Sequence, residues 1–384
     1  MKKVVYLLAM FTFIATTSCS SDDSTSGNND TENPNPGNPD NPGTPGEAGP
    51  VAQATMAPNV GGPNQPNQVF VDLSENIQTG VKRDSWDLGF STGNDFNVII
   101  NGSVKMAVKQ LNTTNIDEVQ VEDLSVAVGY TTPAMGGFVD NPTGVLAGSA
   151  LGEGTAIKAI SATEADNKVY LVNLGFEVGT TTPNVGSVAL DGEARGWKKV
   201  RITRSGSDYK VEYADLNATT HQTITISKDA SYNFVYLNLK NGQRVSVQPK
   251  KATWDLSFTG FTNYYGQPGS QITYYFADYI TTNMLGGTKV YMVQATAETL
   301  ATDYEAFSIS NVDESAFATS VSDQRVIGDS WRNGGGPSSG PSVKDDRFYV
   351  IKDAQNNIYK LRFLALTNDA GERGNPVFEY KLVK

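Results

Sequence analysis

The sequence holds one histidine, His221, and one cysteine, Cys19, among 384 residues. A Ser-His-Asp triad or a Cys–His pair would therefore have to work through His221 alone. Zinc sites assembled from several cysteine and histidine side chains are excluded, and so is a disulfide within the chain. The sequence also contains no recognisable nucleophile elbow and no calcium-binding loop. These features indicate a protein that is not an enzyme; two carboxylates that meet from distant segments, as in glycosidases, are the alternative left open.

Two tryptophan–aspartate pairs, Trp86-Asp87 and Trp254-Asp255, repeat the same local chemistry. We expect both tryptophans to anchor the core, because an indole side chain buries a large apolar area. A carboxylate at the same place in two copies could be catalytic. A structural role, in which each aspartate caps a turn or faces away from its tryptophan, is the favoured interpretation.

The elements that carry these pairs belong to a tandem repeat. Residues 67–73 and 233–239 share period-two apolar alternation, which predicts half-buried strands, and each stretch precedes a Trp-Asp pair. Each repeat closes with three further strand patterns: 169–172, 200–202 and 211–213 in the first, and 348–351, 361–363 and 378–380 in the second. We predict an all-β protein of two tandem antiparallel β-sheet domains, residues 67–227 and 228–384, with short helices at 296–304 and 313–320. Asn101 and Asn283 are expected to correspond as turn or bulge residues.

The first 66 residues carry targeting signals. Two lysines precede an apolar stretch at residues 4–15, which is typical of a secretory signal and too short for a transmembrane helix. Small residues then lead to Cys19, as in a lipoprotein signal, so we predict a signal peptide over residues 1–18 and lipidation of Cys19. A conventional signal peptide with an incidental cysteine is the alternative. Residues 19–66 are rich in Pro, Gly and Asn and are expected to form a disordered tether.

The overall charge argues against nucleic acid as a partner. The chain has 30 Lys and Arg against 41 Asp and Glu, which gives a formal net charge of −11. Binding to nucleic acid requires clustered cations, which this balance does not supply. The predicted contact with a membrane is therefore the lipid anchor. The sequence after Cys19 is typical of lipoproteins displayed on the cell surface; a lipoprotein that faces the periplasm is the alternative.

The second repeat resembles the HmuY-like family of surface haem-binding lipoproteins. The resemblance rests on Trp254-Asp255-Leu256 and on the C-terminal stretch, and the first repeat looks like a more divergent copy. The residues of the C-terminal stretch that carry it are Ser330-Trp331, Gly335-Gly336-Pro337, Gly340-Pro341, 347–350, 356–363 and 378–380. The resemblance implies an all-β fold around a haem cleft, with haem as cofactor or cargo. It also implies delivery of haem, captured free or from a haemoprotein, to a TonB-dependent outer-membrane receptor.

The histidines that bind haem iron in founding members of that family have no counterparts here. The resemblance implies that methionines could replace them, and the candidates are Met135 in a Gly/Pro loop and Met284 beside Asn283. His221 is a third candidate. The alternatives are a loop methionine that packs on the sheet for Met135, a core residue for Met284, and an exposed polar residue for His221.

Other candidate residues border the implied cleft. Gly335, Gly336 and Pro337 lie in the loop that lines the cleft in the family, and Tyr264 and Tyr274 each belong to a pair of adjacent tyrosines. Neighbouring side chains on a strand point to opposite faces, so one tyrosine of each pair is expected to face outward. An outward tyrosine can stack on a sugar or a porphyrin, can bind haem iron, or can be ordinary strand surface.

The prediction from the sequence is a lipid-anchored outer-membrane protein, exposed on the cell surface. This protein is expected to bind haem or a related planar hydrophobic ligand and to deliver it to an outer-membrane transporter. The alternative is a glycan- or protein-binding surface lipoprotein without haem.

Overall fold

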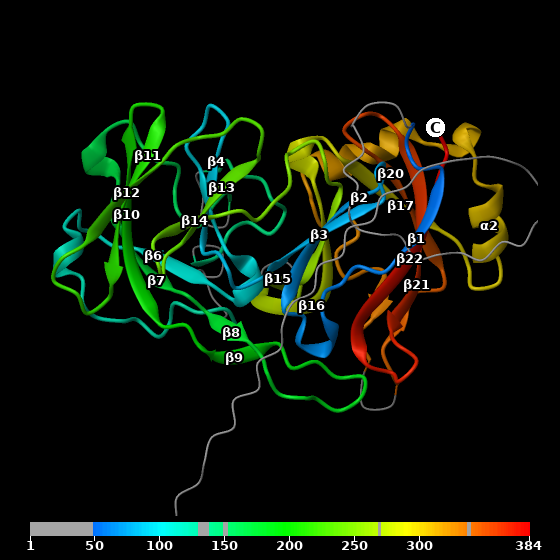
Figure 1. Cartoon of the computed structure of the whole chain (residues 1–384), viewed down its shortest axis with the longest axis horizontal. Coiled ribbons are helices and arrows are strands. Elements are labelled where there is room, and N and C mark those ends of the chain that lie inside the picture. The colour runs from blue at the N-terminus through cyan, green and yellow to red at the C-terminus, as the bar shows by residue number, and fades with distance from the viewer. Residues whose placement is uncertain (1–48, 130–137, 149–152, 268–269, 336–338) are drawn as a thin grey trace, which may run out of the picture. The chain divides into compact units, whose positions relative to one another are not determined.

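The computed structural model describes residues 49–129, 138–148, 153–267, 270–335 and 339–384. Cys19, Met135, Gly336 and Pro337 lie outside these residues. Nearly all regular structure is antiparallel β-strand, which confirms the predicted fold class (Figure 1). The helical segments predicted near the C-terminus are the α-helix α2 (Leu300–Ala306) and a 3₁₀ helix, Glu314–Val321.

Two sheets have five strands each, in the orders β12-β11-β10-β7-β6 and β1-β22-β21-β20-β17. The first belongs to the first repeat, and the second combines strands of the second repeat with β1. The prediction of a disordered tether over residues 19–66 is therefore wrong for Gln53–Met56, which pairs with β22. The first sheet consists of β6 (Ala107–Gln110), β7 (Val169–Asn173), β10 (Trp197–Ser205), β11 (Asp208–Asp215) and β12 (Gln222–Ile226). The second consists of β1 (Gln53–Met56), β17 (Lys289–Gln294), β20 (Arg347–Lys352), β21 (Ile358–Thr367) and β22 (Arg373–Leu382). The three strands predicted at the end of each repeat are therefore adjacent: β7, β10 and β11 match β20, β21 and β22.

Two four-stranded sheets each combine strands from one repeat with a hairpin donated by the other, an arrangement that we call the hairpin exchange. Their orders are β14-β13-β4-β5 and β16-β15-β2-β3. Their strands are β2 (Asn67–Asp72), β3 (Ile77–Lys82), β4 (Leu88–Ser91), β5 (Val98–Ile100), β13 (Phe234–Asn238), β14 (Gln243–Val245), β15 (Leu256–Tyr265) and β16 (Ile272–Thr282). The hairpin that opens the first repeat pairs with β15 of the second, and the hairpin that opens the second repeat pairs with β4 of the first. The hydrogen-bonded sheets therefore cross the boundary between the two repeats.

Two short ribbons complete the described strands. They are β8 (Phe176–Val178) with β9 (Asp191–Ala194), and β18 (Arg332–Asn333) with β19 (Ser342–Val343). The β18–β19 ribbon carries the loop that contains Gly335.

The apolar cores lie against the sheets. One apolar cluster is formed by residues between 88 and 239 and packs on the sheets of that part of the chain. Another packs on the sheets that contain β2, β15 and the C-terminal strands. A third cluster joins the two repeats and contains Trp86 and Trp254. These two tryptophans are 5% and 6% exposed, which confirms that they are core anchors. No helix in the described ranges is both long enough and apolar enough to span a bilayer.

Candidate functional site

The β15–β16 hairpin presents a row of aromatic side chains, which we call the aromatic ladder: Phe261, Tyr265, Tyr274, Phe276 and Tyr279. The strand register pairs Phe261 with Phe276 and Asn263 with Tyr274, which puts these rings on one face of the hairpin. Neighbouring ring centroids lie 4.8 Å apart for Phe261 and Tyr279, 4.9 Å for Tyr274 and Phe276, and 5.5 Å for Tyr265 and Tyr274. These separations are those of interacting aromatic pairs, so the rings support one another.

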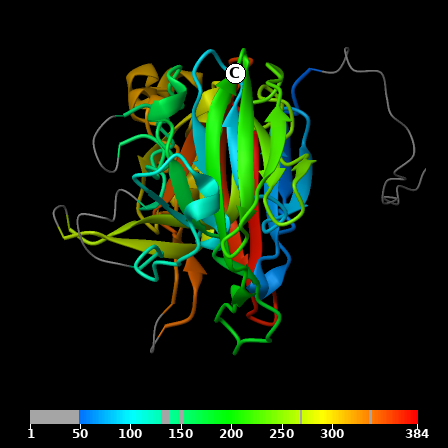
Figure 2. The same ribbon diagram turned by 90° about the vertical axis from the view of Figure 1, so that its left-hand side faces the viewer.

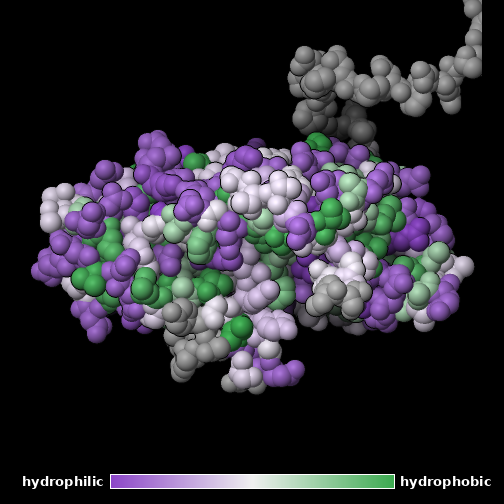
Figure 3. Space-filling view, turned by 90° about the horizontal axis from the view of Figure 1, so that it is seen from below, coloured by the Kyte–Doolittle hydropathy of each residue, from purple (hydrophilic) through white to green (hydrophobic). Residues whose placement is uncertain are grey.

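The ladder runs from the protein interior to solvent. Tyr279 is 1% exposed, whereas Tyr274 is 49% and Tyr265 is 59% exposed. Burial raises the pKa of the Tyr279 phenol, whose oxygen accepts a hydrogen bond from Asn263 Nδ2 at 2.9 Å. The hairpin projects from the sheets in Figure 2, so its outer rings are open to a ligand. The underside of the molecule, by contrast, has only small hydrophobic patches among hydrophilic residues (Figure 3).

The opposite face of the same hairpin packs against the first repeat. The Tyr275 hydroxyl donates to the Ser103 carbonyl oxygen at 2.6 Å, and burial raises its pKa to about 12. Tyr264 lies on this face and is half-buried. One tyrosine of each pair therefore faces outward, as the alternation predicts, and Tyr265 rather than Tyr264 shares a face with Tyr274.

Asp278 fixes the base of the hairpin and ties it to the loop that contains Gly335. The Asp278 carboxylate accepts hydrogen bonds from Arg373 Nε at 2.7 Å and from Gln65 Nε2 at 2.6 Å. Its carbonyl oxygen accepts the indole N–H of Trp331 at 3.0 Å. Arg373 also donates to the Gly334 carbonyl oxygen at 2.9 Å, so one arginine holds both the hairpin and the start of the β18–β19 loop.

The remaining sequence candidates lie elsewhere. Met284 starts a 3₁₀ helix, Met284–Gly286, is partly buried and borders a central cavity that Met106 also lines. His221 Nδ1 lies 3.0 Å from Asp117 Oδ1, and both residues belong to the first repeat, away from the ladder. Among the described residues, no group of three or more His, Cys, Asp or Glu side chains could hold a metal ion.

The aspartates of the two Trp-Asp pairs hold the exchanged hairpins in place. Asp87 Oδ2 accepts the backbone N–H of Leu239 at 2.6 Å, and Asp255 Oδ2 accepts the backbone N–H of Leu73 at 3.0 Å. Each aspartate thus caps the end of the hairpin strand that the other repeat donates. This geometry agrees with the structural interpretation of both carboxylates.

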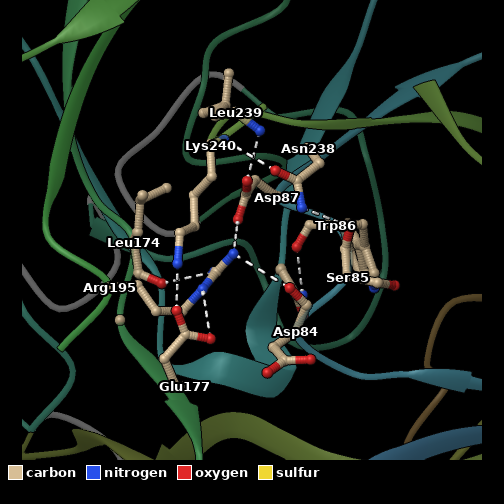
Figure 4. A network of polar contacts seen from close by, with 12 residues as sticks. Asp84, Ser85, Trp86, Asp87, Leu174, Glu177, Arg195, Asn238, Leu239 and Lys240 are labelled. Carbon is tan, nitrogen blue, oxygen red and sulfur yellow. Dashed lines mark hydrogen bonds and ion pairs between the residues drawn. The ribbon is translucent and has the colours of Figure 1, made fainter. Parts of the chain in front are cut away.

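The two aspartates differ in their second partner. Asp87 Oδ1 lies 2.7 Å from Arg195 Nη2, and both side chains are fully buried (Figure 4). Arg195 also donates to the Leu174 carbonyl oxygen at 3.0 Å. Asp255 Oδ1 instead accepts the Thr288 hydroxyl at 2.9 Å, and burial raises the pKa of Asp255 to about 7. Burial raises the pKa of Asp87 too, but Arg195 opposes that shift, whereas no cation is paired with Asp255 and burial favours its protonated form below about pH 7.

The two asparagines correspond as predicted. Asn101 Nδ2 donates to the carbonyl oxygens of Arg83 at 2.7 Å and Trp86 at 2.8 Å. Asn283 Nδ2 donates to those of Lys251 and Trp254, each at 2.8 Å. Both side chains therefore close the turn that carries the Trp-Asp pair.

Fold and side chains together define a duplicated all-β protein whose candidate site is a partly exposed row of aromatic side chains. A sequence model described as HmuY protein matches residues 64–226 and again residues 230–380, so the chain belongs to the HmuY family. This is a non-catalytic haem-binding family, and its members are typically surface lipoproteins. The comparison with curated proteins gives no match.

Proposed function

We propose that the chain is a surface-displayed lipoprotein that binds haem, or a related planar hydrophobic ligand, on the aromatic ladder. The observation that carries the proposal is the exposed pair Tyr265 and Tyr274, whose ring centroids are 5.5 Å apart on the projecting hairpin. The two rings are inclined at 42° to each other, so a porphyrin would stack on one exposed ring rather than on both. A phenolate oxygen is an established ligand of haem iron. Membership of the HmuY family supports the same ligand.

Two hollows in the described structure fit haem less well than the ladder does. The central cavity measures about 140 Å³, well below the ~300–1,000 Å³ of pockets that enclose drug-sized ligands. An open hollow beside Trp197 is larger, but its lining contains no His, Met, Tyr or Cys that could bind the iron. The ladder is therefore the site that combines a stacking surface with an oxygen ligand.

Lipidation of Cys19 and transfer of the ligand to a TonB-dependent receptor complete the proposal. Display at the cell surface would place the ladder where it meets extracellular ligands. Partition of the full chain into detergent, compared with Cys19→Ala, tests the anchor. Equal partition of the two proteins would reject lipidation at this residue.

Titration of the full chain with hemin tests ligand binding. A saturable shift of the Soret band is expected, and Tyr274→Phe should alter its position because the variant keeps the ring but removes the oxygen ligand. Tyr264→Phe is the matched control, since this neighbouring tyrosine lies on the opposite face of the hairpin. A flat titration would reject haem. Binding to a polysaccharide column combined with a flat titration would favour stacking on sugars by the same rings. An unchanged spectrum for Tyr274→Phe would make Tyr265, the other exposed tyrosine of the ladder, the next ligand to change, and Met135 the one after it.

A further inference from the structure

The central cavity of about 140 Å³ lies where the exchanged hairpins meet. Its apolar walls come from both repeats and include Phe70, Trp86, Phe234 and Trp254. An internal cavity of about 150 Å³ accommodates a single benzene ring, so this one matches a one-ring molecule in size. Contacts between the repeats border the cavity, since Gln324 donates from its backbone N–H to the Thr143 carbonyl oxygen at 2.9 Å.

Three residues of the lining carry a buried polar group that has no hydrogen-bond partner among the described residues. The groups are the indole N–H of Trp254, the side-chain carbonyl oxygen of Gln248 and the hydroxyl of Thr259. Trp254 and Thr259 are 6% and 4% exposed. A buried polar group without a partner is destabilising, so a guest that pairs with these groups binds more tightly.

Comparison of the repeats explains why the Trp254 indole N–H is available. In the first repeat the Trp86 indole N–H donates to Gln68 Oε1 at 3.3 Å. The position equivalent to Gln68 in the second repeat is Phe234, which cannot accept a hydrogen bond. The second repeat has therefore exchanged an internal hydrogen bond for an open donor at the cavity wall.

The lining also sets the charge of a guest. It contains no Lys, Arg or His among the described residues, so an anion would find no counter-charge. Its single carboxylate, Asp140, already accepts the backbone N–H groups of Ile100 and Ala156, each at 2.8 Å. An open N–H donor beside open oxygen acceptors suits a group that both accepts and donates, as a phenolic hydroxyl does.

We propose that this cavity is a second ligand site for a neutral one-ring molecule that bears a hydroxyl or an equivalent donor–acceptor group. The ring lies between the aromatic walls, and its hydroxyl accepts from Trp254 and donates to Gln248 or to Thr259. Phe261 is the one ladder residue in the described lining, and it does not belong to the exposed end of the ladder, so the site does not depend on haem binding.

Fluorine NMR of the full chain with three probes tests the site: 4-fluorophenol, fluorobenzene and 4-fluorobenzoate. We expect saturable binding of 4-fluorophenol, weaker binding of fluorobenzene by about three- to tenfold, which is the range of one neutral hydrogen bond, and no binding of the benzoate. Absence of saturable binding for every probe would overturn the proposal. Equal affinity for 4-fluorophenol and fluorobenzene would overturn the assignment of the polar groups.

The two tryptophans provide a matched pair of variants. Trp254→Phe removes the open N–H and should abolish the preference for 4-fluorophenol over fluorobenzene. Trp86→Phe enlarges the same cavity by the same amount but removes an N–H that Gln68 already occupies, so the preference should remain. An identical preference in both variants would contradict the role of Trp254.

Thr259→Val separates an open hydroxyl from one bound to trapped water, and it preserves side-chain volume. If the hydroxyl is open in the free protein, valine should leave the midpoint of chemical unfolding unchanged or raise it. A lowered midpoint, together with the absence of probe binding, would identify a permanently bound water and overturn the site.

Discussion

Replacement of Asp255 by asparagine should stabilise the protein above pH 7 and leave its stability near pH 4 unchanged. Asp255 is 4% exposed, and burial raises its pKa from 3.8 to about 7, with further contributions from the negative charges of Asp72 and Asp353. The folded state therefore retains a proton that the unfolded chain releases between these two pH values. The contribution of this group to stability is complete below pH 3.8 and is lost as the pH rises towards about 7.

The size of the effect follows from the two pKa values. At about 1.36 kcal/mol per pH unit, a change from 3.8 to about 7 corresponds to roughly 4 kcal/mol of unfolding free energy. Asparagine resembles the protonated acid: its oxygen can accept the N–H of Leu73, and its amide can donate to the Thr288 hydroxyl. The variant should therefore keep both contacts without the cost of a buried charge.

The assay is guanidinium chloride unfolding of the wild type and Asp255→Asn at several pH values between 4 and 8. Other carboxyl groups, including Asp140, titrate in both proteins, so the difference between the two curves isolates Asp255. The difference should grow from near zero at pH 4 to as much as about 4 kcal/mol at pH 8 in favour of the variant. A difference that is independent of pH, or a variant less stable than the wild type at pH 8, would refute the reasoning.

Three further predictions concern the exchanged hairpins and their supports. Asp87→Asn leaves Arg195 buried without its counter-charge and should lower stability by about 3–5 kcal/mol at pH 8. Burial raises the pKa of Asp87, so the loss should be smaller at pH 4; an equal loss at both pH values in the same unfolding assay would contradict the shift. Gly260→Ala places a Cβ in collision with the Tyr275 hydroxyl and should cost about 1–3 kcal/mol, while a neutral result in chemical unfolding would show that the hairpin can shift. A fragment of residues 84–250 keeps two complete sheets, whereas a fragment of residues 67–227 lacks β13 and β14 and leaves β2 without β15. The first should unfold cooperatively in circular dichroism and the second should not, and cooperative folding of both would contradict the exchange.

Much of the local structure could be predicted from the sequence. Period-two alternation located the strands of both repeats, and the recurrence of tryptophan before aspartate identified the core anchors. The pairing of the opening hairpins could not be predicted, because both hairpins have the same alternation and either pairing satisfies it. The division into domains at residues 67–227 and 228–384 stays a prediction, since the match to the family follows the repeats whereas the hydrogen bonds cross between them.

The candidate site was only partly predictable for a similar reason. The tyrosine pairs were evident, but the register across the turn decides which tyrosines share a face. Asn263 lies opposite Tyr274, so Tyr265 joins the ladder and Tyr264 does not. Asp278, which holds the base of the hairpin, depends on contacts with residues as distant as Gln65 and Arg373 and has no local signature.

The hairpin exchange also has a consequence for how such a chain arises. A single-repeat ancestor that paired in this way would be an intertwined homodimer, with each subunit lending its first hairpin to the other. Duplication and fusion of the gene would turn that dimer into one chain without altering a single interface. Fusion would also free the halves from obligatory symmetry, so one buried aspartate could keep an arginine while its counterpart came to rely on a proton. The different partners of Asp87 and Asp255 are what such a loss of symmetry would produce.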